Sequence, residues 1–78
     1  MADMRKVEMK ELGFGWKEIE FKDIKEGMWV RMFESTGEPV MDKLTDTTEW
    51  HVTRGAYLNK DGILTFEYAT YEINAVEN

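Results

Sequence analysis

Apolar and polar residues alternate in short runs along most of this chain, and such alternation is typical of half-buried β-strands. The clearest run covers residues 28–33, where Trp29, Arg31 and Phe33 face one side and three apolar residues face the other. Similar runs occur at residues 17–22, 40–44, 49–58, 63–68 and 69–73. Five or six short strands at this spacing predict a mainly β fold, built as a small antiparallel barrel or sandwich.

Glycines indicate how these strands are connected. Residues 59–62 read Asn-Lys-Asp-Gly, and an Asp-Gly pair between two apolar runs is a strong hairpin signal. Gly55 interrupts the run at residues 49–58, and a glycine inside a strand marks a bulge or a bend. Residues 23–27 end in a glycine and predict a further turn.

The two ends of the chain are less regular than its middle. Met4, Val7 and Leu12 roughly suit one face of a helix, whereas Val7 and Met9 also suit a strand. The chain has 78 residues, which are enough for one domain but not for two of roughly 50 residues each. We expect a single domain over 1–78, with a short helix or arm over 1–15, a barrel over 16–73 and a frayed tail over 74–78.

Residues 21–32, Phe-Lys-Asp-Ile-Lys-Glu-Gly-Met-Trp-Val-Arg-Met, resemble the opening turn and strand of many SH3-like barrels. The resemblance covers residues 21–73 and implies an SH3-like barrel. Small proteins of this kind are frequent in bacteriophage genomes, and some of them bind host proteins. The chain lacks the acidic and aromatic signature of the peptide-binding members, so the resemblance does not imply proline-rich ligands.

The net charge of −6 is concentrated in the later part of the chain. Residues 1–31 contain seven acids and seven bases, whereas residues 32–78 contain nine acids and three bases. Direct nucleic-acid binding is disfavoured, because it usually requires a basic patch. The excess of acids either keeps the chain soluble or forms a negative surface for a basic partner.

The usual catalytic and metal-binding patterns are missing from the sequence. There is no cysteine, and a Ser-His-acid triad would have to use both the only serine, Ser35, and the only histidine, His51, without any supporting motif. Asp42, Asp46 and Glu49 share a polar stretch, but their spacing is not that of a calcium loop. We therefore expect no catalytic residues, no metal and no cofactor.

These observations predict a non-enzymatic inhibitor or adaptor, encoded by a phage, whose acidic face mimics DNA on the basic surface of a host nucleoid or other DNA-binding protein. The alternative is a structural module, such as a homodimer, that associates through Trp29 and Phe33, because one face of that strand must be covered by something other than the core. No signal peptide or membrane-spanning run is visible in the sequence, so a cytoplasmic location is expected. The expected partner-binding acids are Glu34, Glu38, Asp42, Asp46, Glu49, Asp61, Glu67 and Glu72.

Overall fold

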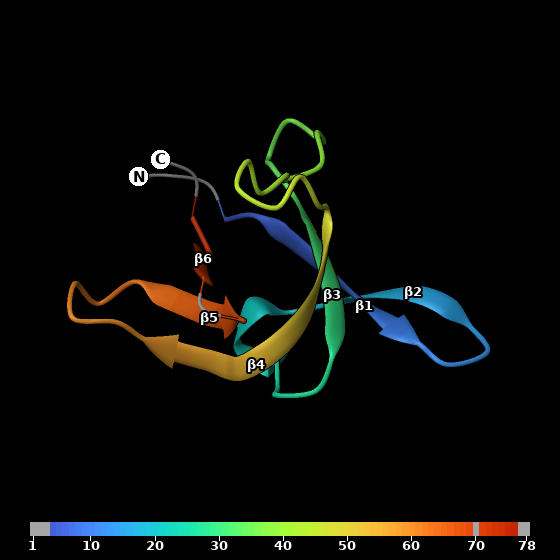
Figure 1. Ribbon diagram of the computed structural model, residues 1–78, viewed down its shortest axis with the longest axis horizontal. Helices are drawn as coiled ribbons and strands as arrows, with labels where there is room; N and C mark the ends of the chain where they lie inside the picture. Colours follow the sequence, from blue (N-terminus) through green and yellow to red (C-terminus); the bar gives the residue numbers. More distant parts are fainter. Residues whose placement is uncertain (1–3, 70, 77–78) are drawn as a thin grey trace.

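Six antiparallel strands form one sheet in this computed structural model, which describes residues 4–69 and 71–76 (Figure 1). The strands are β1 (Lys6–Glu11), β2 (Gly15–Ile19), β3 (Trp29–Phe33), β4 (Glu49–Leu58), β5 (Leu64–Tyr68) and β6 (Tyr71–Asn74), with a 3-10 turn, η1 (Phe21–Asp23), between β2 and β3. Their order across the sheet is β2-β1-β3-β4-β5-β6. The prediction of a mainly β, antiparallel fold is confirmed.

The core lies on the concave side of the curved sheet. The alternation in β3 places Val30 and Met32 in the core, where both are fully buried. Trp50 of β4 and Phe66 of β5 supply the largest buried side chains, with their ring centroids 6.4 Å apart. Phe21 of η1 packs 5.6 Å from the ring of Phe66 and covers one end of the core. Because aromatic side chains each bury about 150–250 Å², these rings provide much of the apolar burial in so short a chain.

The expected N-terminal helix is wrong, because the segment forms β1 between β2 and β3. Val7 and Met9 lie on the inner face of the sheet, opposite Met32 and Val30. Pairing as a strand buries both residues while β1 bonds to a neighbour on each side. A helical face would instead have used Leu12, which is exposed.

The expected frayed tail is also wrong over residues 74–76. Met4 forms a bridge with Val76, and the Arg5 N–H donates to the Ala75 carbonyl at 2.8 Å. Ala75 is fully buried. These contacts join the start of β1 to the end of β6, while residues 77–78 lie outside the described residues.

Residues 40–44 do not form the expected strand. An isolated bridge joins Asp42 to Thr47, and the Leu44 N–H donates to the Asp42 carboxylate at 2.8 Å. Side-chain bonds of this kind favour a turn over a sheet ladder. The run at residues 17–22 is likewise divided, since β2 ends at Ile19 and η1 begins at Phe21.

The predicted bulge at Gly55 and the predicted hairpin turn at residues 59–62 are both confirmed. The pairing of β4 with β5 shifts register on either side of Arg54, as expected for a bulge near Gly55. A Cβ at Gly55 would lie 2.8 Å from the Ile24 carbonyl oxygen, so the close approach of two backbones requires glycine there. Residues 59–62 connect β4 to β5, and the Asn59 N–H donates to the Ile63 carbonyl at 3.0 Å.

Candidate protein-binding surface

The convex face of the sheet carries a row of aromatic and basic side chains. Trp16 of β2 pairs with Lys10 of β1, and the register of β1 with β3 places Lys10 next to Trp29. Trp29 in turn stacks on His51 of β4, with ring centroids 5.1 Å apart. The row therefore crosses four strands on the side away from the core.

Trp29 and Phe33, the two aromatic residues expected to bind a partner, differ in how well they are covered. Trp29 is 48% exposed. Phe33 is half-buried beneath cations, with the Lys6 ammonium 5.9 Å and the Arg31 guanidinium 5.4 Å from its ring centre. Glu8 holds that guanidinium at 2.7 Å, which fixes it in place. Trp29 is the better placed of the two to contact another protein.

The hairpin formed by β1 and β2 projects from the body of the sheet (Figure 1). At its tip Leu12 is 96% exposed and Phe14 is 81% exposed. Gly13 and Gly15 adopt φ values of +83° and +82°, which only glycine takes without strain. The Phe14 N–H donates to the Glu11 carbonyl at 3.0 Å. The turn is thus held by its backbone while both large side chains point into solvent.

Trp29, Leu12 and the two glycines of the hairpin tip line one hollow of about 320 Å³. Its walls also include Lys10 and Glu11. We call Leu12, Phe14 and Trp29 the hairpin patch. The sequence analysis did not single out Leu12 or Phe14 as binding residues, although two large apolar residues on either side of a glycine were the available signal.

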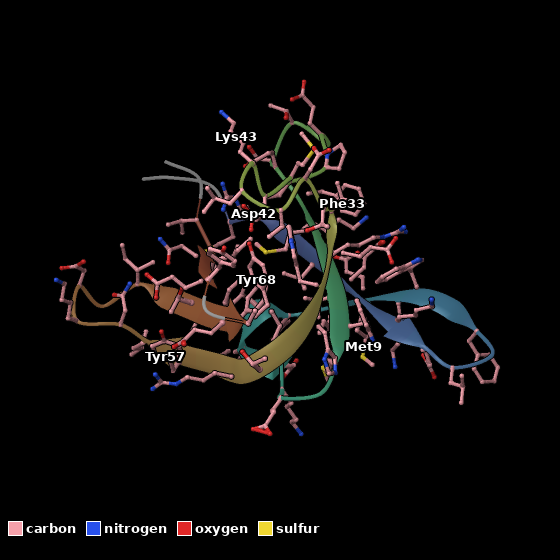
Figure 2. All side chains as sticks on the ribbon, viewed as in Figure 1. Met9, Phe33, Asp42, Lys43, Tyr57 and Tyr68 are labelled. Carbon is pink, nitrogen blue, oxygen red and sulfur yellow. The ribbon has the colours of Figure 1, made fainter. Side chains whose placement is uncertain are left out.

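The eight acids expected to form one face lie in three separate places. Four are in the connection between β3 and β4, and Glu49 follows at the start of β4. Asp61 lies in the turn between β4 and β5, at the far left in Figure 1, whereas the β3–β4 connection lies at the top. Glu67 and Glu72 face each other across β5 and β6, beside Tyr57, and Figure 2 places Tyr57 well away from Asp42.

Glu34 and Asp42 have partners within the protein. The Arg5 guanidinium donates to both carboxylate oxygens of Glu34, at 3.0 and 3.1 Å. The Tyr68 hydroxyl donates to Asp42, and this bond lowers the pKa of the Asp42 carboxyl. Burial is the main cause, and the bond to Asp42 the second, of a Tyr68 pKa above its usual range. Both acids therefore attach the β3–β4 connection to the rest of the protein.

Glu67 and Glu72 share the hydroxyl of Tyr57. It donates to Glu67 at 2.7 Å and lies 3.2 Å from Glu72. The bond to Glu67, with smaller effects of burial and of nearby charge, raises the pKa of Tyr57 to about 12. The bond from Tyr57 and, to a smaller extent, the bond from Arg54 lower the pKa of Glu67. This pair of carboxylates belongs to a local network on the sheet.

Residues 34–49, which we call the acidic loop, contain five acids and one base, a sum of −4 out of the total −6. Two large apolar side chains are exposed within it, Leu44 at 77% and Met41 at 51%. Glu38, Asp46 and Glu49 are also exposed. The acidic loop therefore holds five of the eight expected acids in and next to one connection of the fold.

Among residues 4–69 and 71–76, no three His, Asp or Glu side chains gather where they would hold a metal ion. His51 is occupied in the stack with Trp29. The same described part of the chain has no helix long and apolar enough to cross a membrane.

Comparisons with family models, curated proteins and solved structures find no match to this chain. The SH3-like resemblance of residues 21–32 thus stays a prediction. The function has to be argued from the two surfaces described above, the hairpin patch and the acidic loop.

Proposed function

We propose that this chain is a non-enzymatic protein-binding module, an inhibitor or adaptor, that holds a basic partner protein. The observation that carries the proposal is the exposure of Leu12, Phe14 and Trp29 on and beside a projecting hairpin. A single exposed apolar residue is ordinary, but several gathered on one surface are typical of interaction sites.

The hairpin patch supplies the apolar anchors of the complex. Interface energy is concentrated in a few aromatic and large apolar residues that become fully desolvated on binding. Leu12 and Phe14 make little use of their apolar area in the folded chain, so their burial by a partner costs no internal contact. The backbone hydrogen bond from the Phe14 N–H to the Glu11 carbonyl holds the turn and reduces the ordering that binding would otherwise require.

The acidic loop selects a basic partner. A local charge of −4 attracts a positive surface, speeds encounter and disfavours acidic proteins. A basic DNA-binding surface of a host protein is the natural target, and an acidic loop lying on it would compete with DNA. Glu38, Asp46 and Glu49 would supply the exposed contacts. Glu34, Asp42, Glu67 and Glu72 have structural partners, and Asp61 lies apart.

The test is retention of proteins from a bacterial lysate on immobilised wild-type chain and on the double variant Leu12→Ser/Phe14→Ser. Leu58→Ser is the matched control, because Leu58 is also exposed but lies at the other end of the sheet. We expect a basic protein that wild type and Leu58→Ser retain and the tip variant loses. Identical retention by all three proteins would overturn the proposal.

The charge component has its own test. The variant Glu38→Gln/Asp46→Asn should weaken the retained complex several-fold at low salt and should have little effect at high salt, where exposed charges are screened. Asn tolerates the φ of +56° that Asp46 adopts. The matched control is Glu26→Gln/Asp61→Asn, which removes the same charge at exposed positions outside the acidic loop. Equal weakening by both variants would leave only a general effect of net charge.

A second candidate is self-association, which the exposure of Trp29 favours. Two copies that bury the hairpin patch against each other would form a dimer whose stability hardly depends on salt. Sedimentation of wild type and of Trp29→Ser over a wide concentration range distinguishes the candidates. A wild-type monomer at every concentration excludes the dimer.

A further inference from the structure

β2 is the outermost strand of the sheet. Its neighbour is β1, and no backbone hydrogen bond joins it to any other strand within the described residues. An outermost strand presents a row of N–H and C=O groups with which another chain can pair. The same strand continues directly into the hairpin tip that carries Phe14.

The backbone groups on the open edge belong to Trp16 and Glu18. The Glu11 C=O accepts a hydrogen bond from the Phe14 N–H of the turn, so it points toward the side of β1 on which β2 lies. In an antiparallel ladder the backbone N–H and C=O groups of successive residues point to opposite sides of the strand. Glu11, Met9 and Val7 of β1 therefore point their backbone groups toward β2, and their partners in β2 point theirs toward β1. Gly15, Lys17 and Ile19 therefore bond to β1, and the two residues between them face outward.

A notch of about 360 Å³ lies at the end of this edge. Its lining includes the apolar side chains of Ile19, Phe21 and Leu64, and the charged residues that line it are Arg5, Lys6, Glu18, Glu20 and Lys22. Ile19 and Leu64 are only partly buried. The notch can therefore accept an apolar side chain from a strand laid along β2.

A second copy of this chain fits the edge poorly. Two copies related by a two-fold axis place residues of the same sheet face opposite each other. The register that uses all five residues of β2 sets Lys17 against Lys17 of the other copy, and like charges directly opposite destabilise the pair. Registers shifted by two residues leave only residues 15–17 or 17–19 facing each other.

On the convex face, the charges beside Glu18 favour a basic side chain on an added strand. Glu18 is the end residue of a row of paired residues that crosses the sheet through Glu8, Arg31 and Glu49. This row contains three carboxylates and one guanidinium. Lys6 reaches this row at 3.6 Å from Glu8 and 3.8 Å from Glu18. The Glu18 side chain remains 67% exposed. A lysine or arginine of an added strand would lie beside it, and the next residue would point toward Ile19 and the notch.

We infer that the partner binds by strand addition: an extended segment with alternating basic and apolar residues pairs with the open edge of β2 and places an apolar side chain in the notch. This inference rests on the proposed function, because it gives the binding mode of the same basic partner. Main-chain hydrogen bonds supply affinity in this mode, and alternate side chains supply specificity. The hairpin tip contacts the partner at one end of the segment and the notch at the other.

The experiment compares Glu18→Pro with Glu18→Ala. Both variants remove the carboxylate, but only proline removes the N–H on the open edge, and an edge strand tolerates this change. The probe is a fluorescein-labelled peptide of alternating valine and lysine, about nine residues long at roughly 3.3 Å per residue. Fluorescence anisotropy gives the dissociation constants. A peptide of alternating valine and glutamate is the charge control.

We expect Glu18→Pro to bind the valine-lysine peptide about tenfold more weakly than Glu18→Ala, since one hydrogen bond is lost. The valine-glutamate peptide should bind the wild type at least tenfold more weakly than the valine-lysine peptide. A valine-lysine peptide with alternate N-methylated amides should also lose binding to the wild type, whether or not the proline variant folds. Absent binding to the wild type, equal binding by the proline and alanine variants, or full binding of the methylated peptide would overturn the inference.

These outcomes are separate from those of the proposed function. If the tip variant loses its retained protein while Glu18→Pro keeps it, the module binds a partner by another mode. If Glu18→Pro loses peptide binding while the tip variant retains every protein, the edge binds strands and the hairpin patch is not the anchor.

Discussion

The two long hairpins of this sheet use their apolar residues in opposite ways. The β4–β5 hairpin buries Phe66 and Tyr68 in the core and ends in a polar turn. In that turn, the Asn59 carboxamide oxygen accepts hydrogen bonds from the N–H groups of Asp61 and Ile63, at 2.9 and 3.0 Å. The β1–β2 hairpin has an apolar tip, and its Leu12 and Phe14 contact mainly solvent.

This difference separates residues that the fold needs from residues that it does not need. A polar turn closed by its own hydrogen bonds is sufficient to form a hairpin. The large apolar residues at the other tip add nothing comparable to folding, and they increase the exposed apolar surface. Their exposure in a small acidic chain is the basis of the proposed contact with another molecule.

The largest expected effect contrasts one phenylalanine from each hairpin. Phe66→Ala should cost about 3–5 kcal/mol of unfolding free energy, because it empties the centre of the core. Phe14→Ala should change that free energy by less than about 0.5 kcal/mol, as for other exposed sites. Urea denaturation followed by tryptophan fluorescence measures both. A large loss in Phe14→Ala would show that the tip packs on the body of the protein.

A medium effect contrasts one glycine from each hairpin. Gly55→Ala should cost about 1–3 kcal/mol, because its Cβ would meet the Ile24 carbonyl oxygen at 2.8 Å. At Gly13 nothing lies within 4 Å of an added Cβ, so Gly13→Ala should cost only about 1–2 kcal/mol for its φ of +83°. Thermal unfolding measures the two midpoints. A cost for Gly13→Ala greater than for Gly55→Ala would contradict the proposed close packing at Ile24.

The smallest effect concerns the charges of the β4–β5 hairpin. The Tyr57 hydroxyl holds the pKa of Glu67 below its ordinary value, so the stability that this bond contributes is present above that value and is lost as pH falls through the pKa of the folded state. At the alkaline end it is lost as pH rises through the Tyr57 pKa of about 12. Tyr57→Phe should therefore raise the pKa of Glu67 and make stability less sensitive to acid. Carbon-detected NMR titration of the carboxylates checks this, and an unchanged Glu67 pKa would contradict it.

The sequence by itself determined the elements in which local signals agree. Alternation in residues 28–33, the Asp-Gly turn and the Gly55 interruption each predicted what the structure has, because side-chain period and turn chemistry act over a few residues. Residues 3–12 were ambiguous, since Val7 fits a helix together with Met4 and Leu12 or a strand together with Met9 until β3 is placed beside them. The glycine between Leu12 and Phe14 was a local sign that these two residues lie in a turn.

Only the tertiary structure decided which charges lie together. The sequence places nine acids after Arg31, but the distribution of the eight expected partner-binding acids over three places depends on how the strands pair, and strand pairing is a long-range property. The Arg5–Glu34 and Asp42–Tyr68 bonds join residues far apart in the chain. The open edge of β2 likewise exists only once the order of the strands is set, because a strand has a free side only when its neighbours are known.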